Sequence, residues 1–382
     1  MKRPEMSTTI SLRGNTAAAK PHMMGDGASI SCYCNEVPTF VEPELIRLYG
    51  SAFSTLEHFR AYGGLEQAST YVARNGTGQL VSVLLFRIEN RTVRVLNELI
   101  RIGQEEVAQF AGYIFATFEQ VRVISFNAVE LEIGRLPFVC QRFNCSEDIA
   151  LALPPTPEAY LAQLGKATRK NIKHHLSRLR RQFPTLRFEA RCNEEIDASR
   201  LRDIAAHNHA RMTKKHKTSY LDDEESTRLL RLVRSSGLVT ALTIDGRVCA
   251  GAICSLVGDN YFSYVNAHDP SYDTYRLGTL CCYLTICECI VRGGREFHLL
   301  WGRDLYKYTL AGTQRNLDHF DIYRSPAACL PATGRMLQNA ARSAMRQTRF
   351  WLLDPQRQNR HPLLRRTLGI LRRIALRTSG AS

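Results

Sequence analysis

The stretch from Tyr261 to Lys307 constrains the fold of this chain most, because it reads as strand, polar loop, helix and strand in unbroken succession. Tyr261 to Val265 is aromatic and β-branched, and His268 to Arg276 is polar. An apolar helical run from Gly278 to Val291 precedes a second strand, expected from Phe297 to Trp301. This order predicts a crossover unit in which the helix begins beside the polar loop.

The start of this helix is a candidate anion-binding site. A helix N-terminus presents backbone N–H groups without partners and the positive end of the helix dipole, which suits a phosphate. Arg276 would add a charge-assisted hydrogen bond. A glycine at a helix start is also ordinary turn chemistry, so the pattern alone does not establish a site. The residues expected to form the site are Arg276, Leu277, Gly278, Thr279 and Leu280.

Two hairpin turns, at Asp245-Gly246 and Gly258-Asp259-Asn260, predict that an antiparallel meander leads into this unit. An earlier meander is expected from Thr70 to Leu96, followed by a helix from Glu105 to Phe118 and a buried strand from Val121 to Phe126. The two halves therefore share one order of elements, which predicts an internal duplication. Only the second half has the basic loop with its glycine, so a cofactor is expected there alone.

The length of 382 residues exceeds that of a typical single domain. The run Pro154-Pro155-Thr156-Pro157 marks a boundary, with Thr156 as a helix N-cap. We expect a disordered N-terminal tail over 1–35 and an N-terminal half without a cofactor loop over 36–153. A C-terminal half with that loop should cover 154–330, and an Arg-rich amphipathic helical tail 331–382.

The formal net charge of +15 is unevenly distributed, since eleven Arg and a single acid, Asp354, lie between Arg335 and Arg377. The body of the chain is therefore only mildly basic. Within the tail, residues 363–377 alternate pairs of Arg with Leu and Ile at helical spacing. This pattern fits either peripheral membrane contact through 363–377 or a helix docked on the protein body.

A second basic feature lies on the helix expected from Pro157 to about Phe183. From Lys166 to Arg181 this helix has no acidic residue. A solvated helix face normally mixes both signs of charge, so an anionic partner is favoured. CoA phosphates, RNA and lipid headgroups would all satisfy the pattern. Its basic residues are Lys166, Arg169, Lys170, Lys173, His174, His175, Arg178, Arg180 and Arg181.

The twelve Cys are scattered without a CxxC pair, and Cys281 and Cys282 fall in the apolar helical run, where they are expected to act as small hydrophobic side chains. This usage predicts a reduced, cytoplasmic protein with no bound metal. No apolar run is long enough to cross a bilayer. Lys2 and Arg3 are not followed by an apolar segment, so a secretory signal is not expected.

Four segments carry a family resemblance: GKATRKNIKHHLSRLRR, DGRVCAGAICSLVGDNYFSYVNAHDP, YRLGTLCCYLTICECIVRGGREFHLL and WGRDLYKYTLAG. Together they resemble the FemAB-like branch of the GNAT N-acetyltransferase superfamily, and within it the BioF-like or CelD-type acetyltransferase domain. The resemblance extends from about Tyr160 to Ser325 and is only topological from about Phe40 to Leu153. It implies a mixed α/β fold of the acyl-CoA N-acyltransferase type, with two tandem GNAT-like halves and a C-terminal basic helical extension.

The resemblance implies an acyl-CoA-dependent N-acyltransferase, with acetyl-CoA or another acyl-CoA as co-substrate and its pyrophosphate at Arg276 to Leu280. The acceptor would be an amine of a small molecule, a sugar or a cell-envelope precursor, at the inner face of the membrane or in the cytoplasm. The loop has one glycine where the superfamily usually has a longer Gly motif, which puts conventional CoA contacts in question.

Two other functions stay open at this point. FemAB relatives use aminoacyl-tRNA as the donor, so a transferase of that kind is one alternative. A nucleic-acid-binding protein without enzymatic activity is the other. The complete crossover unit argues against pure nucleic-acid binding, which would not require it, so no nucleic-acid partner is expected.

The resemblance also suggests catalytic residues at the ends of the two strands of the unit. Asp304 or His268 would deprotonate the amine, and Tyr306 would protonate the departing thiolate, unless it only caps a core. Lys307 would orient an acyl or acceptor carboxylate. The segment from His207 to Tyr220 would cover the acceptor. The candidate substrate-binding residues are His209, Lys214, Lys215, Tyr220 and Trp301.

Overall fold

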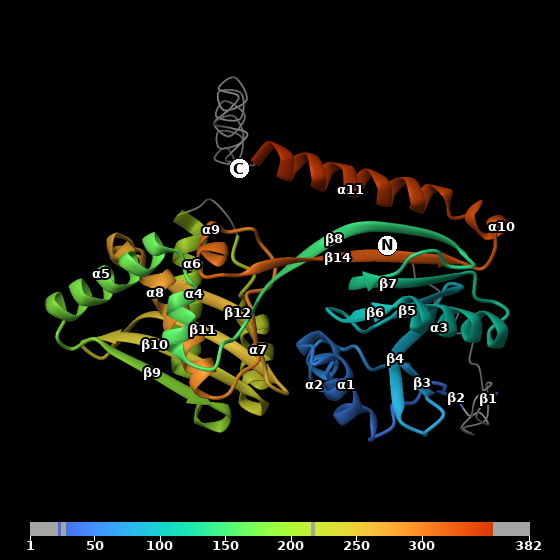
Figure 1. Ribbon diagram of the computed structural model, residues 1–382, viewed down its shortest axis with the longest axis horizontal. Coiled ribbons are helices and arrows are strands. Elements are labelled where there is room, and N and C mark those ends of the chain that lie inside the picture. The colour runs from blue at the N-terminus through green and yellow to red at the C-terminus, as the bar shows by residue number, and fades with distance from the viewer. Residues whose placement is uncertain (1–21, 24–27, 215–217, 354–382) are drawn as a thin grey trace, which may run out of the picture.

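The computed structural model of the chain describes residues 22–23, 28–214 and 218–353, in which one mixed sheet runs through the whole molecule (Figure 1). Fourteen strands take part. Thirteen of them follow one path, in the order β1-β2-β3-β4-β5-β7-β14-β8-β13-β12-β11-β10-β9, and β6 pairs with β7 beside this path. The fold is therefore mixed α/β, as the sequence predicted.

The strands form where β-branched and aromatic residues alternate or run together. Their bounds are β1 His22–Met23, β2 Ser29–Tyr33, β3 Ser69–Arg74, β4 Leu80–Glu89, β5 Thr92–Val95, β6 Arg101–Gly103, β7 Val123–Glu132, β8 Val139–Ala152, β9 Arg187–Cys192, β10 Gly237–Ile244, β11 Arg247–Val257, β12 Asn260–His268, β13 Glu296–His298 and β14 Thr313–Tyr323.

Several helices begin at side-chain caps, for example at Thr55, Thr156 and Asp222. The α-helices are α1 Val41–Tyr49, α2 Leu56–Ala61, α3 Gln104–Thr117, α4 Pro157–Gln163, α5 Lys166–Gln182, α6 Ala198–Lys214, α7 Asp223–Ser235, α8 Leu277–Val291, α9 Leu305–Thr309, α10 Pro326–Cys329 and α11 Thr333–Leu353, and the 3₁₀ helices are η2 Ala52–Ser54, η3 Asn193–Glu195 and η4 Pro270–Tyr275.

Each half contains the same unit of three antiparallel strands, a crossover helix and a parallel strand. In the first half β3, β4 and β5 pair antiparallel, and β7 returns parallel to β5 after α3. In the second half β10, β11 and β12 pair antiparallel, and β13 returns parallel to β12 after α8. The predicted duplication is confirmed as a repeated topology.

The last strand of each half reaches into the sheet of the other half. β8 follows β7 in the chain but pairs with β13 and β14, whereas β14 follows β13 and pairs with β7 and β8. Figure 1 shows β8 and β14 as long strands side by side across the molecule. The halves therefore share a central region in the order β7-β14-β8-β13, and they cannot separate without breaking its ladders.

Each crossover helix is buried in the core of its own half. α3 buries Val107, Phe110 and Ile114 in the core of the first half. α8 is buried on most of its surface, and Cys281 and Cys282 lie inside the second core as free thiols. These cysteines act as small apolar side chains, as the sequence predicted.

Three elements differ from the sequence-based expectation. Ser29–Tyr33, expected within the disordered tail, forms β2 and pairs with β3, because alternate residues of this segment are buried. The helix expected from Pro157 to Phe183 is broken at Gly165, the N-cap of α5, whose ψ of 147° is not helical. β13 ends at His298. From Leu299 onward the chain still hydrogen-bonds to β8 but no longer pairs with β12.

α11 packs its polar face on the sheet and turns an apolar face outward. Arg335 and Asn339 donate hydrogen bonds to Asp321 of β14, whereas Leu337 and Met345 are 66% and 65% exposed. The run 363–377, predicted to be an amphipathic helix, lies outside the described residues. Among the helices that the structure describes, none combines the length and the apolar character that a membrane span requires.

We expect Phe126→Ala to weaken the whole molecule, because Phe126 of β7 contacts both Phe110 of α3 and Phe320 of β14. The free energy of unfolding should fall by about 3–5 kcal/mol. Urea denaturation should still show one cooperative transition, since the halves share their central strands. The control Val81→Ala, at an exposed position of β4, should change stability by less than about 0.5 kcal/mol. Two transitions, of which only one shifts, would contradict the shared centre.

Candidate active site

The parallel strands β12 and β13 separate after three residues. Their last pair is Phe262↔His298, whose rings stack with centroids 4.2 Å apart. Beyond it, Leu299 N donates to Ile149 O of β8 at 2.7 Å, and Ile149 N donates to Leu300 O at 3.2 Å. Leu300 adopts a positive φ of 56° at this turn. The divergence opens a cleft of about 120 Å³ between the two strands.

The cleft is lined by residues of β12, of the segment that follows β13, of α6, of the segment before α7 and of α9 with the loop before it. Tyr220 Oη closes one side by donating to Tyr264 O at 2.6 Å. The lining residues are Asn208, Arg211, Met212, Tyr220, Ser263, Tyr264, Val265, Asn266, Leu299, Leu300, Trp301, Asp304, Tyr306 and Lys307.

Lys307 of α9 is buried and holds one wall of the cleft in place. Its Nζ donates to the backbone oxygens of Leu299 at 2.7 Å, Leu300 at 3.2 Å and Trp301 at 2.5 Å. All three ammonium protons thus have acceptors within the protein. Burial lowers the pKa of Lys307, although the nearby carboxylate of Asp304 opposes this shift. The sequence predicted that Lys307 orients a carboxylate, but in the structure it orders the chain after β13.

Gly278 is the point where β12 and α8 meet. Asn266 Nδ2 donates to Gly278 O at 3.1 Å, and a Cβ on Gly278 would lie 2.6 Å from Nδ1 of His268. A side chain here would force the His268 ring to move, so glycine is required for this close approach. Asn266 Oδ1 is buried without a hydrogen-bond partner among the described residues, and Asn266 lines the cleft.

The N-terminus of α8 has free donors for an anion. Arg276, its N-cap, is exposed and adopts a left-handed conformation with φ of 54°. The N–H groups of Thr279 and Leu280 donate to Arg276 O, whereas those of Leu277 and Gly278 have no partner within the described residues. The five residues predicted as the cofactor loop therefore form one helix start, at which Arg276 is exposed and Leu277 and Gly278 are buried.

Cations of α5 lie beside this helix start. Arg178 packs over the Tyr275 ring, with its guanidinium carbon 4.6 Å from the ring centroid. Burial lowers the pKa of His175, and the positive charges of its neighbours, Arg276 and Arg178 among them, lower it further. The basic face predicted on 166–181 therefore continues onto Arg276.

His268 lies at the helix start rather than in the cleft. It is the last residue of β12, and its Nε2 lies 2.8 Å from Oδ1 of Asp273 in η4. Asp273 Oδ2 accepts from Lys214 Nζ at 2.5 Å, and the hydrogen bonds from Lys214 and His268 lower the pKa of Asp273. His268, predicted as a base, and Lys214, predicted to bind substrate, thus belong to one polar chain beside the start of α8.

The other predicted residues divide into three groups. Asp304, Tyr306, Tyr220 and Trp301 line the cleft. His209 does not, because its Nε2 lies 2.5 Å from Leu221 O and ties α6 to the segment before α7. Lys215 lies outside the described residues.

A proton donor and a carboxylate occur together in the cleft. Burial raises the pKa of Tyr306, Asp304 adds to the rise and Asn266 opposes it, so the phenol stays protonated near neutral pH. Asp304 is exposed at the mouth of the cleft. Arg211 Nε, on the opposite wall, is buried without a hydrogen-bond partner within the described part of the chain.

The residues that sequence reasoning missed lie inside regular elements. Asn266 is within β12, and Asn208 and Arg211 are on α6 in the segment predicted to cover the acceptor. Asn266 was missed because the predicted catalytic residues were placed beyond the ends of the strands. The available signal was a polar amide in an otherwise aromatic and β-branched strand.

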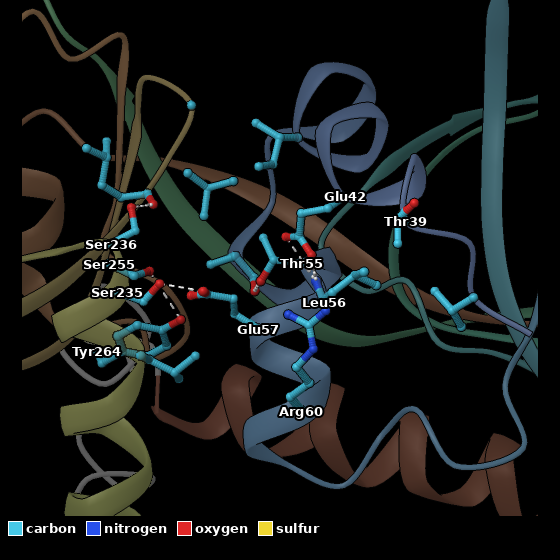
Figure 2. A pocket seen from close by; sticks show the side chains of 17 residues that line it. Thr39, Glu42, Thr55, Leu56, Glu57, Arg60, Ser235, Ser236, Ser255 and Tyr264 are labelled. Atoms are coloured by element: carbon cyan, nitrogen blue, oxygen red, sulfur yellow. Dashed lines mark hydrogen bonds between the residues drawn. The ribbon is translucent and has the colours of Figure 1, made fainter.

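A second hollow, of about 400 Å³, lies between the two halves (Figure 2). In Figure 2 Glu57 of α2 points toward Ser235 of α7, whereas the guanidinium of Arg60 points toward Glu42. Glu57 accepts a hydrogen bond from Ser235 of α7, which ties the halves together. Tyr264 lines both this hollow and the cleft, so the two spaces share a wall.

Comparisons with known proteins agree with this geometry. Residues 166–308 match the family model described as an acetyltransferase (GNAT) domain. This segment contains α5, the second crossover unit and most of α9, so the cleft belongs to a GNAT domain. Among curated proteins, none matches the chain.

Solved structures extend the likeness to both halves. A crystal structure of FemX aligns with a TM-score of 0.55 at 9% identity, covering 77% of this chain and 98% of that one. The C-terminal domain of a putative lysylphosphatidylglycerol synthetase from Agrobacterium fabrum aligns with a TM-score of 0.45 at 14% identity, covering 78% and 93%. The chain therefore has a GNAT fold of the FemAB-like kind, as its sequence resemblance implied.

Lys307→Met should destabilise the protein, because three backbone oxygens would lose their donor. We expect the free energy of unfolding to fall by about 2–4 kcal/mol, measured by urea denaturation. Lys170→Met, which removes an exposed cation of α5, is the control and should change stability by less than about 0.5 kcal/mol. Equal stability of the two variants would show that the wall of the cleft does not depend on Lys307.

Proposed function

We propose that the protein transfers an acyl group from acyl-CoA, acetyl-CoA in the simplest case, to an amine. The observation that carries this proposal is the opening between β12 and β13 beside a helix start whose N-cap, Arg276, is exposed. A GNAT domain over residues 166–308 implies acyl-CoA as a co-substrate. The splayed strands supply a place for a thioester, and the helix start supplies a place for a phosphate.

The residues at the start of α8 suit the pyrophosphate of CoA. The N–H groups of Leu277 and Gly278 have no partner within the described residues, although both residues are buried, and the helix dipole favours negative charge there. Arg276 is exposed at the same point, and Arg178 of α5 lies nearby. Gly278, the single glycine of the loop, leaves space for the His268 ring. We therefore assign the contacts with the anion to backbone N–H groups and to arginines.

Proton transfer is assigned to the side chains in the cleft. Acyl-CoA supplies an activated thioester, whose C–S bond breaks as the new C–N bond forms. Asp304 at the mouth of the cleft takes the proton that the amine loses. The phenol of Tyr306 supplies the proton that the departing sulfur needs, which its raised pKa permits. Lys307 acts as a positioning residue through the three backbone oxygens that it binds.

We place the acceptor amine on a small molecule, a sugar or a cell-envelope precursor, and the reaction in the cytoplasm or at the inner face of the membrane. The hollow in Figure 2 supports an acceptor larger than the cleft, since Tyr264 borders both spaces. Membrane contact through 363–377 stays part of this proposal.

Aminoacyl-tRNA is the second candidate donor. α5 exposes cations along 17 residues without an acidic residue, which is more basic surface than one pyrophosphate needs. RNA binding to such a surface would weaken steeply with rising salt. The shared fold with FemX is compatible with this donor as well.

Isothermal titration calorimetry with acetyl-CoA tests the leading proposal. Arg276→Ala should weaken binding by about tenfold to a hundredfold, because a hydrogen bond to a charged group contributes about 1.5–3 kcal/mol. Arg135→Ala, which removes an exposed cation outside α5 and outside the start of α8, is the control and should bind like the wild type. Binding of aminoacyl-tRNA without binding of acetyl-CoA would favour the second donor. Binding of neither would contradict both.

A further inference from the structure

A cavity of about 700 Å³ lies in the first half, outside the cleft. Strands β4, β5, β7 and β14 contribute to its lining, α2 borders it, and α11 covers it. Because β14 is the last strand of the second half and α11 follows it in the chain, the cavity exists only in the assembled molecule. The charged residues of its lining are Arg87, Glu89, Arg94, Glu98, Arg335 and Arg342.

Positive charge predominates in this cavity, with four guanidinium groups and two carboxylates in the lining. Glu89 is shared, at 3.8 Å from Arg87 and 3.0 Å from Arg94. Burial raises the pKa of Glu98, which favours the neutral, protonated form of this carboxyl group. Arg342 is exposed on α11 and has no ion-pair or hydrogen-bond partner within the described residues. The lining of the cavity therefore carries positive charge that its two carboxylates do not balance.

Two buried nitrogen atoms of the lining also lack partners. They are His58 Nδ1 and Arg87 Nε, neither of which has a hydrogen-bond partner within the described residues. Burial lowers the pKa of His58 to about 4, so its ring is neutral near pH 7 and offers a hydrogen bond without charge. Buried polar atoms in folded proteins are usually paired, so unpaired ones in a cavity wall indicate a missing ligand or water.

The inward face of α11 is polar because it covers this cavity. Arg335 is fixed there by Asp321 of β14 at 2.9 Å and by Ser125 Oγ of β7 at 3.1 Å. Asn339 donates to the same Asp321. A helix that only closed the sheet would place apolar side chains inward. α11 instead presents a guanidinium group held in a defined orientation.

The cavity also adjoins the catalytic cleft. Phe53 lines the cavity, and its ring contacts the Trp301 ring with centroids 5.7 Å apart and the Tyr264 ring at 6.0 Å. Trp301 and Tyr264 both line the cleft. One layer of aromatic rings thus separates the two spaces, and a ligand in the cavity would lie next to the site of acyl transfer.

We propose that this cavity binds a small organic molecule through a dianionic oxyanion group, a phosphate or a pair of carboxylates, next to the site of acyl transfer and separate from it. Guanidinium groups bind such oxyanions through paired hydrogen bonds. A volume of about 700 Å³ is typical of small-molecule sites. The hollow of Figure 2 is different, since it offers Arg60 against Glu42 and Glu57.

Calorimetric titration of the full chain with inorganic pyrophosphate and with malonate tests the site. At least one of these anions should bind, and the tighter one identifies the phosphate or the dicarboxylate source. Arg94→Ala and Arg342→Ala should each weaken this binding by about tenfold and leave acetyl-CoA binding unchanged. Arg135→Ala, which removes an exposed cation outside α5 and outside the cavity lining, is the control. Arg276→Ala should show the reverse pattern, losing acetyl-CoA and keeping the small anion.

Three results would overturn the proposal in whole or in part. The cavity is not an anion site if neither probe binds, or if Arg94→Ala and Arg342→Ala bind both probes like the wild type. Loss of pyrophosphate binding in Arg276→Ala alone would assign the anion to the start of α8.

Discussion

The pairing of β8 with both β13 and β14 is the constraint on which the rest of the structure depends. β8 and β14 form a ladder from Val139↔Tyr323 to Ala150↔Thr313, and β13 joins the far side of β8 through Glu296 to His298. The chain after His298 then follows β8 instead of β12. The cleft in the second half is therefore opened by a strand that the first half supplies.

Charged groups near the end of β8 fix the loop that borders the cleft. Glu147 is buried, accepts a hydrogen bond from Gly302 N at 3.1 Å and pairs with Arg303 and with Arg346 of α11. Next to it, Asp148 Oδ2 lies 2.7 Å from His298 Nδ1. Removing one partner from such a buried network costs more than an exposed ion pair contributes. α11 is thereby coupled to the loop that carries Asp304, so the cavity and the cleft share structural supports.

Local sequence patterns predicted the elements, and long-range pairing decided the site. The turns at Asp245-Gly246 and Gly258-Asp259 need only neighbouring residues, so the second meander was predictable, and so was the helix beginning at Leu277. The first part of β8 carries no such local signal, because its partly buried polar residues become a strand only when β14 pairs with them.

The roles of single residues were harder to predict than the elements. His268 was expected beyond its strand, yet it belongs to β12 and packs against Gly278. Lys307 was expected to meet a ligand, and it binds three backbone oxygens that no sequence pattern reveals. Asp304 and Tyr306 were predictable as cleft residues because they follow the diverging strand directly.

Hydrogen–deuterium exchange with and without acetyl-CoA tests the central claim most directly, since it reports on both the cleft and the helix start in one measurement. The account predicts slower exchange of the Leu277 and Gly278 amides, which have no hydrogen-bond partner within the described residues, together with slower exchange in residues 263–266 of β12. Slower exchange confined to other parts of the molecule, or none under conditions where acetyl-CoA binds, would contradict the claim that acyl-CoA occupies the splay between β12 and β13.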